Sequence, residues 1–146
     1  MKLTKFTKGI LDFMFYAGIL TCVTLPFTLK WVGNYIPHYK TDYYPLLSLF
    51  LASGIFAVLI IKELRRMFAT VLREDCFVKE NVKSLEKMGN YSFYIAFLTV
   101  FRLGIIFTMA SLVVIAVFVI AGLFSKVLSG VFEEAVTYKL ENDLTI

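Results

Sequence analysis

Three long apolar runs, separated by basic and aromatic segments, narrow the possible folds of this chain most. They cover residues 10–29, 44–61 and 91–124. A helix of about 20 apolar residues crosses a hydrocarbon core of about 30 Å, so the first two runs each predict one membrane-spanning helix. A chain of 146 residues that is 59% hydrophobic has more apolar surface than a soluble domain of this size buries. The sequence therefore predicts an all-α integral membrane protein.

The first run has a proline near its far end and lysines before its near end. A signal peptide cleaved at "ILTC" is one interpretation, but Thr21 is larger than the residue that normally precedes such a cysteine. Because more apolar runs follow, we expect this helix to stay in the membrane. We expect Pro26 to kink or end it, since proline removes a backbone donor and clashes with the preceding turn.

The third run is too long for one span and slightly short for two spans with a turn. Arg102 decides the matter, because an arginine at the bilayer centre is costly and one in an external turn reaches water. We predict a helix that ends near Phe101 and another that starts near Ile105. The predicted fold is an integral membrane four-helix bundle in a single domain. Its four spans cover residues 10–29, 44–61, 86–101 and 105–128.

Basic residues are distributed unevenly in this four-span arrangement. With the N-terminus inside, twelve of the 15 lysines and arginines are on the inner side. The three on the outer side are Lys30, Lys40 and Arg102. Inner loops of membrane proteins carry the excess of positive charge, so both termini are predicted to be cytoplasmic. The basic residues form no continuous stripe, which argues against direct binding of nucleic acid.

The linker between the second and third spans, residues 62–88, is polar but has the pattern of a helix. Val78, Val82, Leu85 and Met88 form one apolar stripe, and lysines and glutamates occupy the other face. The sequence predicts a short amphipathic cytoplasmic helix that leads into the third span. It is either a connector that lies on the membrane or a docking face for a cytoplasmic partner.

The last segment, residues 129–146, continues the helical pattern of the fourth span. We therefore expect a helical extension into the cytoplasm. Its final residues, "DLTI", are apolar and β-branched, which is unusual for a solvated tail. Leu144 and Ile146 either tuck against the inner linker or bind another protein.

Residues with catalytic or metal-binding chemistry are few. His38, the single histidine, has no cysteine or carboxylate cluster near it in the sequence. Cys22 and Cys76 are predicted to lie in different environments, so no disulfide is expected. The sequence contains neither a phosphate-binding glycine loop nor a pair of buried carboxylates. We expect no enzyme activity, catalytic residue, metal or cofactor.

Two stretches, "REDCFVKENVKSLEKMG" and "GVFEEAVTYKLENDLTI", resemble a family of small four-helix bacterial membrane proteins of unknown function. The resemblance covers essentially the whole chain. It implies residence in a bacterial plasma membrane, and family members are often encoded beside a Cro/CI-type helix-turn-helix regulator. At Val78 the family more often has a serine or threonine, which would cap the following helix, so the helix start is less well specified here.

The resemblance and the predicted topology together suggest a partner-binding surface on the cytoplasmic side. The hypothesis names these residues: Phe77, Glu80, Asn81, Leu85, Glu141, Asn142, Asp143, Leu144 and Ile146. The expected function is a membrane-bound regulatory partner that binds or sequesters a small helix-turn-helix regulator. The alternative is an immunity protein that acts on an external peptide. It would do so through the outer loop between the first two spans, residues 30–44, which is rich in aromatic residues. A transporter ranks last, because the spans offer almost no polar groups to a solute. A homo-oligomer remains open.

Overall fold

The computed structural model describes residues 2–73 and 77–145 and is all-helical over that part of the chain. Four helices are long and one is short. In chain order they are α1 (Lys2–Gly33), α2 (Pro37–Thr41), α3 (Tyr43–Leu72), α4 (Lys79–Ile105) and α5 (Met109–Thr145).

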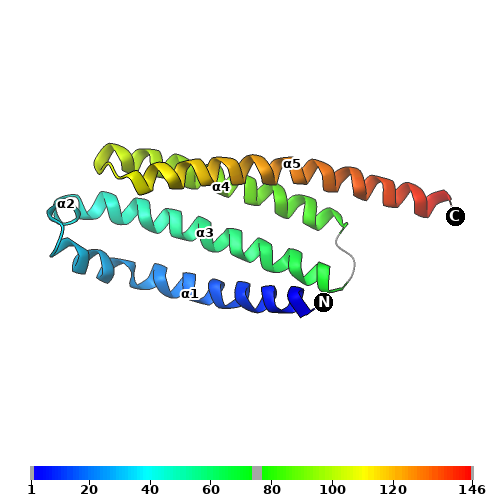
Figure 1. Ribbon diagram of the computed structural model, residues 1–146, viewed down its shortest axis with the longest axis horizontal. Coiled ribbons are helices and arrows are strands. Elements are labelled where there is room, and N and C mark those ends of the chain that lie inside the picture. Colours follow the sequence, from blue (N-terminus) through cyan, green and yellow to red (C-terminus); the bar gives the residue numbers. More distant parts are fainter. Residues whose placement is uncertain (1, 74–76, 146) are drawn as a thin grey trace.

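The long helices run antiparallel to their chain neighbours and lie in a row (Figure 1). Helix α1 packs on α3, α3 on α4, and α4 on α5. Among the described residues, the backbone of α1 is not in close contact with that of α4 or α5. The backbone of α3 is not in close contact with that of α5. The helices therefore form an open row, where the sequence predicted a bundle. The two chain ends lie at one end of the row, which we call the terminal end, and α5 extends beyond the other helices there (Figure 1).

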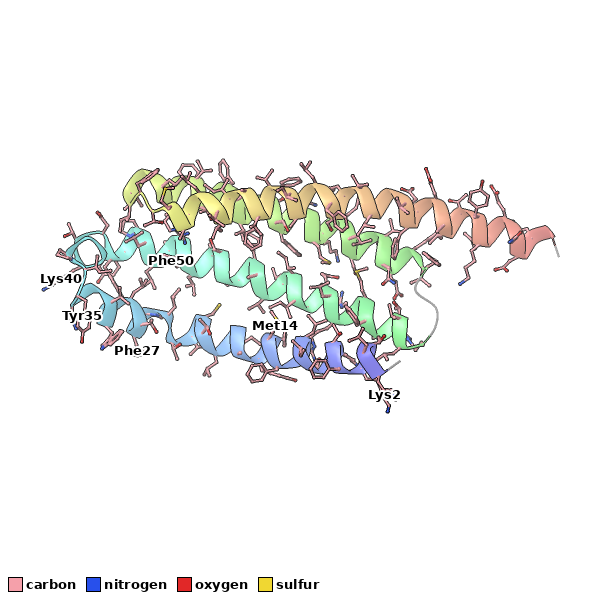
Figure 2. All side chains as sticks on the ribbon, viewed as in Figure 1. Lys2, Met14, Phe27, Tyr35, Lys40 and Phe50 are labelled. Carbon is pink, nitrogen blue, oxygen red and sulfur yellow. The ribbon has the colours of Figure 1, made fainter. Side chains whose placement is uncertain are left out.

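Three of these helices, α1, α3 and α5, are long and apolar enough to cross a membrane. Large apolar side chains cover their surface: Phe13 is 73% exposed and Phe27 is 74% exposed. Side chains project outward along the whole row, with Lys2 at the terminal end and Tyr35 and Lys40 at the other (Figure 2). Lipid can cover such faces, so the helices need not enclose an apolar core.

Small and hydroxyl-bearing residues occupy the contacts of α4 with its neighbours. The buried polar residues of α4 and α5 are Asn81, Ser84, Ser92, Thr99, Ser111, Ser125 and Ser129. Two of these serines cross to α4: Ser125 donates to the Leu85 carbonyl at 2.6 Å, and Ser129 donates to the Val82 carbonyl at 3.1 Å. Small residues let helix backbones approach closely in lipid, which explains how the polar α4 lies between two apolar helices.

The third apolar run forms two helices, as predicted, but the boundary differs. Helix α4 ends at Ile105, one turn later than the predicted end at Phe101. Arg102 lies in this last turn and not in the external turn. Its guanidinium lies 4.4 Å from the centre of the Phe50 ring and donates to Ser111 Oγ at 3.3 Å. These contacts on α3 and α5 accommodate the charge, so the helix does not need to end before it.

The predicted linker helix is not a separate element. Residues 62–72 belong to α3, and residues 79–88 are the first turns of α4, which continues without a break to Ile105. Residues 79–88 therefore lead directly into the predicted third span, as expected. No proline interrupts this stretch, and Leu85 is buried between the helices, so tertiary packing keeps it in line with the rest of α4.

The other two helix predictions have different outcomes. Helix α1 does not end at Pro26 but continues to Gly33, and the hydroxyl of Tyr43 on α3 donates to the Pro26 carbonyl at 3.0 Å. The helical C-terminal extension is confirmed, because α5 is continuous to Thr145. Val78 precedes α4 in an extended conformation without a side-chain cap, as its lack of a hydroxyl predicts.

Candidate functional site: two grooves beside the start of α4

The start of α4 borders two grooves at the terminal end, one toward α5 and one toward α3. Each has a volume of about 470 Å³. Helix α5 is fixed to α4 by the two serine hydrogen bonds and by a close approach at Gly89, where an added Cβ would lie 3.2 Å from the Gly122 carbonyl oxygen. This packing places the projecting part of α5 beside the first turns of α4.

The groove between α4 and α5, which we call the tail groove, combines an apolar surface with charged residues of both signs. Its lining residues are Lys79, Val82, Lys83, Glu133, Val136, Thr137, Leu140, Glu141 and Leu144. The lysines come from α4 and the glutamates from α5, so the two helices present opposite charges. Val136 is buried, whereas Leu144 is 86% exposed. The tail groove thus becomes more open toward the chain end.

An aromatic contact joins the segment before α4 to α5. The rings of Phe77 and Phe132 have their centroids 5.3 Å apart and are tilted by 59°. Phe77 is 44% exposed, so part of its ring remains accessible to a second molecule. This contact links the segment before α4 to the tail of the protein.

The predicted partner-binding residues do not all lie on one surface. Glu141 and Leu144 line the tail groove, and Phe77 contacts the tail through Phe132. Asn142 and Asp143 are exposed on the last turns of α5. Ile146 lies outside the described residues.

Three other predicted residues lie away from the tail groove. Asn81 and Leu85 are 1% and 4% exposed, because α4 buries them against its neighbours. Glu80 lines the second groove, toward α3. The sequence left two alternatives for the end of the tail: packing against the inner linker or binding another protein. Leu144 does not pack against the linker, because its side chain is exposed.

The second groove, which we call the basic groove, lies between α3 and α4. Its lining residues are Glu63, Arg66, Ala69, Thr70, Arg73, Glu80, Asn81, Lys83, Ser84 and Lys87. Hydrogen bonds hold its floor together: Ser84 donates to Glu63 Oε2 at 2.8 Å, and Asn81 donates to Thr70 Oγ1 at 2.7 Å. Glu63 is only 5% exposed and its other carboxylate oxygen lies 3.7 Å from Arg66.

Sequence reasoning missed Glu63, because it occurs in the charged segment "KELRR" and was assigned to the solvated linker. Its burial depends on Ser84, which is 21 residues away in the chain. A usable signal was the recurrence of Ser84, Ser92 and Thr99 at intervals of eight and seven residues, which marks one polar face of a helix.

A further ion pair joins α1 to α3. Arg65 Nε lies 2.6 Å from Asp12 Oδ1, and the Arg65 guanidinium lies 4.5 Å from the centre of the Phe15 ring. Both charged side chains are about one-third exposed. Sequence analysis did not identify this pair, because its two residues lie 53 positions apart.

The described part of the chain contains few side chains suited to metal binding or thiol chemistry. No group of three His, Cys, Asp or Glu residues there could hold a metal ion. Cys22 is a free thiol whose sulfur lies beside Gly54 of α3. Cys76 and the side chain of His38 lie outside the described residues, so the predictions for them stay predictions.

Comparison with known proteins gives one match. The model of the family described as "Protein of unknown function (DUF2975)" matches residues 30–146, which includes both grooves. No curated protein matches the chain, and no solved structure does. Because the match covers most of its length, the chain belongs to the DUF2975 family of proteins of unknown function.

Proposed function

We propose that this protein is a non-enzymatic, multi-pass membrane protein whose tail groove binds a small cytoplasmic helix-turn-helix regulator. The observation that carries the proposal is the tail groove itself, which lies at the terminal end and is formed by α4 and the projecting part of α5. The excess of basic residues on that side of the topology supports a cytoplasmic position in a bacterial plasma membrane.

The groove has the chemistry that an amphipathic helix recognises. Val82, Val136 and Leu140 offer apolar contacts, and exposed Leu144 extends them. Such a groove binds the apolar face of a partner helix, whereas the flanking lysines and glutamates set its orientation and encounter rate. A small regulator built of helices, and presented near the membrane, meets both requirements.

The test is a binding measurement with the purified full-length protein and a Cro/CI-type helix-turn-helix protein, the kind of partner that the family resemblance implies. In the variant Leu140→Glu/Leu144→Glu, two apolar contacts of the groove are replaced by charge. We expect binding to weaken at least tenfold, since apolar anchors carry most of the affinity at such surfaces. Insertion into membranes should not change, because both residues are exposed.

Tyr138→Glu is the matched control. Tyr138 lies two residues before Leu140 on α5, is 73% exposed and does not line the groove. It should retain the affinity of the unmodified protein. Equal binding by the double variant and by the unmodified protein would contradict the proposal.

A second candidate function, immunity to an external peptide, rests on the opposite end of the row. A groove of about 570 Å³ there has Trp31, Tyr43 and Tyr44 among its lining residues, and Tyr44 is 80% exposed. Aromatic rings with polar tips suit both the headgroup region and a bound peptide. Trp31→Ala/Tyr44→Ala should then sensitise cells to the peptide and leave binding of the regulator unchanged.

A further inference from the structure

We infer that the basic groove binds the phosphate group of an anionic phospholipid from the membrane leaflet at the terminal end. Its lining includes four cationic side chains, Arg66, Arg73, Lys83 and Lys87, against two carboxylates, Glu63 and Glu80. The site therefore has an excess of two positive charges. It differs from the tail groove, with which it shares only Lys83.

Most of the cationic side chains that line the basic groove are not paired with its buried carboxylate. The buried Glu63 carboxylate accepts from Ser84 and lies near Arg66, so its charge is already compensated. Within the described ranges, Arg73, Lys83 and Lys87 form no ion pair. An anion entering the groove would therefore meet cations without having to displace a carboxylate from them.

The position of the groove along the helices matches the level of lipid phosphates. The apolar run of α3 ends at Ile61, and that of α4 begins at Tyr91. With a rise of 1.5 Å per residue, Arg66 and Lys87 lie about 6–8 Å beyond these points. The headgroup region extends about 5–8 Å from the hydrocarbon core, and basic pockets between helices at this level bind anionic headgroups.

Soluble phosphate has the same chemistry as the headgroup, and the level of the groove favours the lipid. The experiment measures thermal unfolding of the full-length protein in a neutral detergent with added phosphatidylglycerol, phosphatidylcholine or inorganic phosphate. We expect phosphatidylglycerol to raise the Tm in a concentration-dependent way and phosphatidylcholine and inorganic phosphate to have little effect.

In Arg66→Gln/Lys87→Gln, the apparent affinity for phosphatidylglycerol should fall at least tenfold, because the change removes two of the four cations that line the groove. Neither residue lines the tail groove, so failure of this inference and failure of the proposed function are distinguishable. The matched control is Lys2→Gln/Lys5→Gln, which removes two exposed charges from the same end of the row. It should retain the affinity.

Three outcomes would overturn the inference: equal stabilisation by both lipids, equal loss of affinity in the control, or stabilisation by inorganic phosphate to which phosphatidylglycerol adds nothing. The last would assign the groove to a soluble phosphate. If the double variant does not fold, Lys87→Gln alone keeps the pair of Glu63 and Arg66 and should still weaken binding of phosphatidylglycerol relative to the control.

Discussion

Helices α4 and α5 and helices α1 and α3 are both antiparallel neighbours, yet different interactions hold the two pairs together. Between α4 and α5, serine hydroxyls donate across to backbone carbonyls, and Gly122 leaves room for Phe93, whose ring would lie 2.7 Å from an added Cβ. Between α1 and α3, Asp12 and Arg65 form an ion pair, and Cys22 lies close to Gly54.

The number of buried residues also differs between α4 and α1. In α4, which packs on both α3 and α5, eight residues are buried, whereas the longer α1, which packs on α3, buries Leu11, Leu29 and Gly33. The difference indicates that α4 is packed along its length from two sides, and that α1 is packed at fewer points. We therefore expect a steric change between α4 and α5 to lower stability more than loss of the ion pair between α1 and α3.

The largest effect is expected from Gly122→Leu. The new side chain would overlap the ring of Phe93 and push α5 from α4, which should lower the free energy of unfolding by about 3 kcal/mol. The control is Gly130→Leu on the same helix, where an added Cβ meets nothing within 4 Å. Unfolding in mixed micelles measures both, and a control that loses as much stability would mean that close packing is not what holds α5.

A smaller effect is expected from Ser84→Ala. This change removes the hydroxyl that donates to the buried Glu63 carboxylate and should lower the free energy of unfolding by about 2 kcal/mol, because a buried charge loses a donor. The double variant Ser84→Ala/Glu63→Leu should recover part of that loss. A double variant that is less stable than Ser84→Ala would show that Glu63 stabilises the fold without its serine.

The smallest effect is expected between α1 and α3. A double-mutant cycle of Asp12→Asn and Arg65→Gln should give a coupling energy of about 1 kcal/mol, since both side chains are partly exposed. High salt should reduce it. A coupling near zero would mean that packing, and not the ion pair, holds α1 to α3, and would weaken the contrast with α4 and α5.

Periodicity and charge predicted much of the fold. The apolar runs gave the all-helical class, the split of residues 91–124 into two helices and the long continuous α5. The end of α4 was predicted wrongly, because the free-energy cost of placing Arg102 within a helix depends on its contacts with Phe50 and Ser111. The sequence does not show that these residues lie beside it. The open row was also unpredictable, since lipid-facing and helix-facing apolar residues look alike in a sequence.

The candidate site was predicted in part. The prediction joined the start of α4 to the tail, and the tail groove has walls from both segments. It assigned Asn81 and Leu85 to a surface open to a partner, because one face of this helix was assumed to be free of contacts within the protein. Contacts with both α3 and α5 bury these residues, and such two-sided packing is a tertiary property that one helix's pattern does not reveal.

The projection of α5 past the start of α4 has a geometric consequence for the tail groove. Residues 133–145 rise about 20 Å along the helix axis and belong to the continuous helix α5, so the position of each side chain along this helix sets its direction relative to α4. Because each residue advances a helix by 100°, one inserted residue would rotate Leu140 and Leu144 away from α4, whereas four would nearly restore their direction. Helical phase, and not only the identity of side chains, is therefore part of what this sequence encodes.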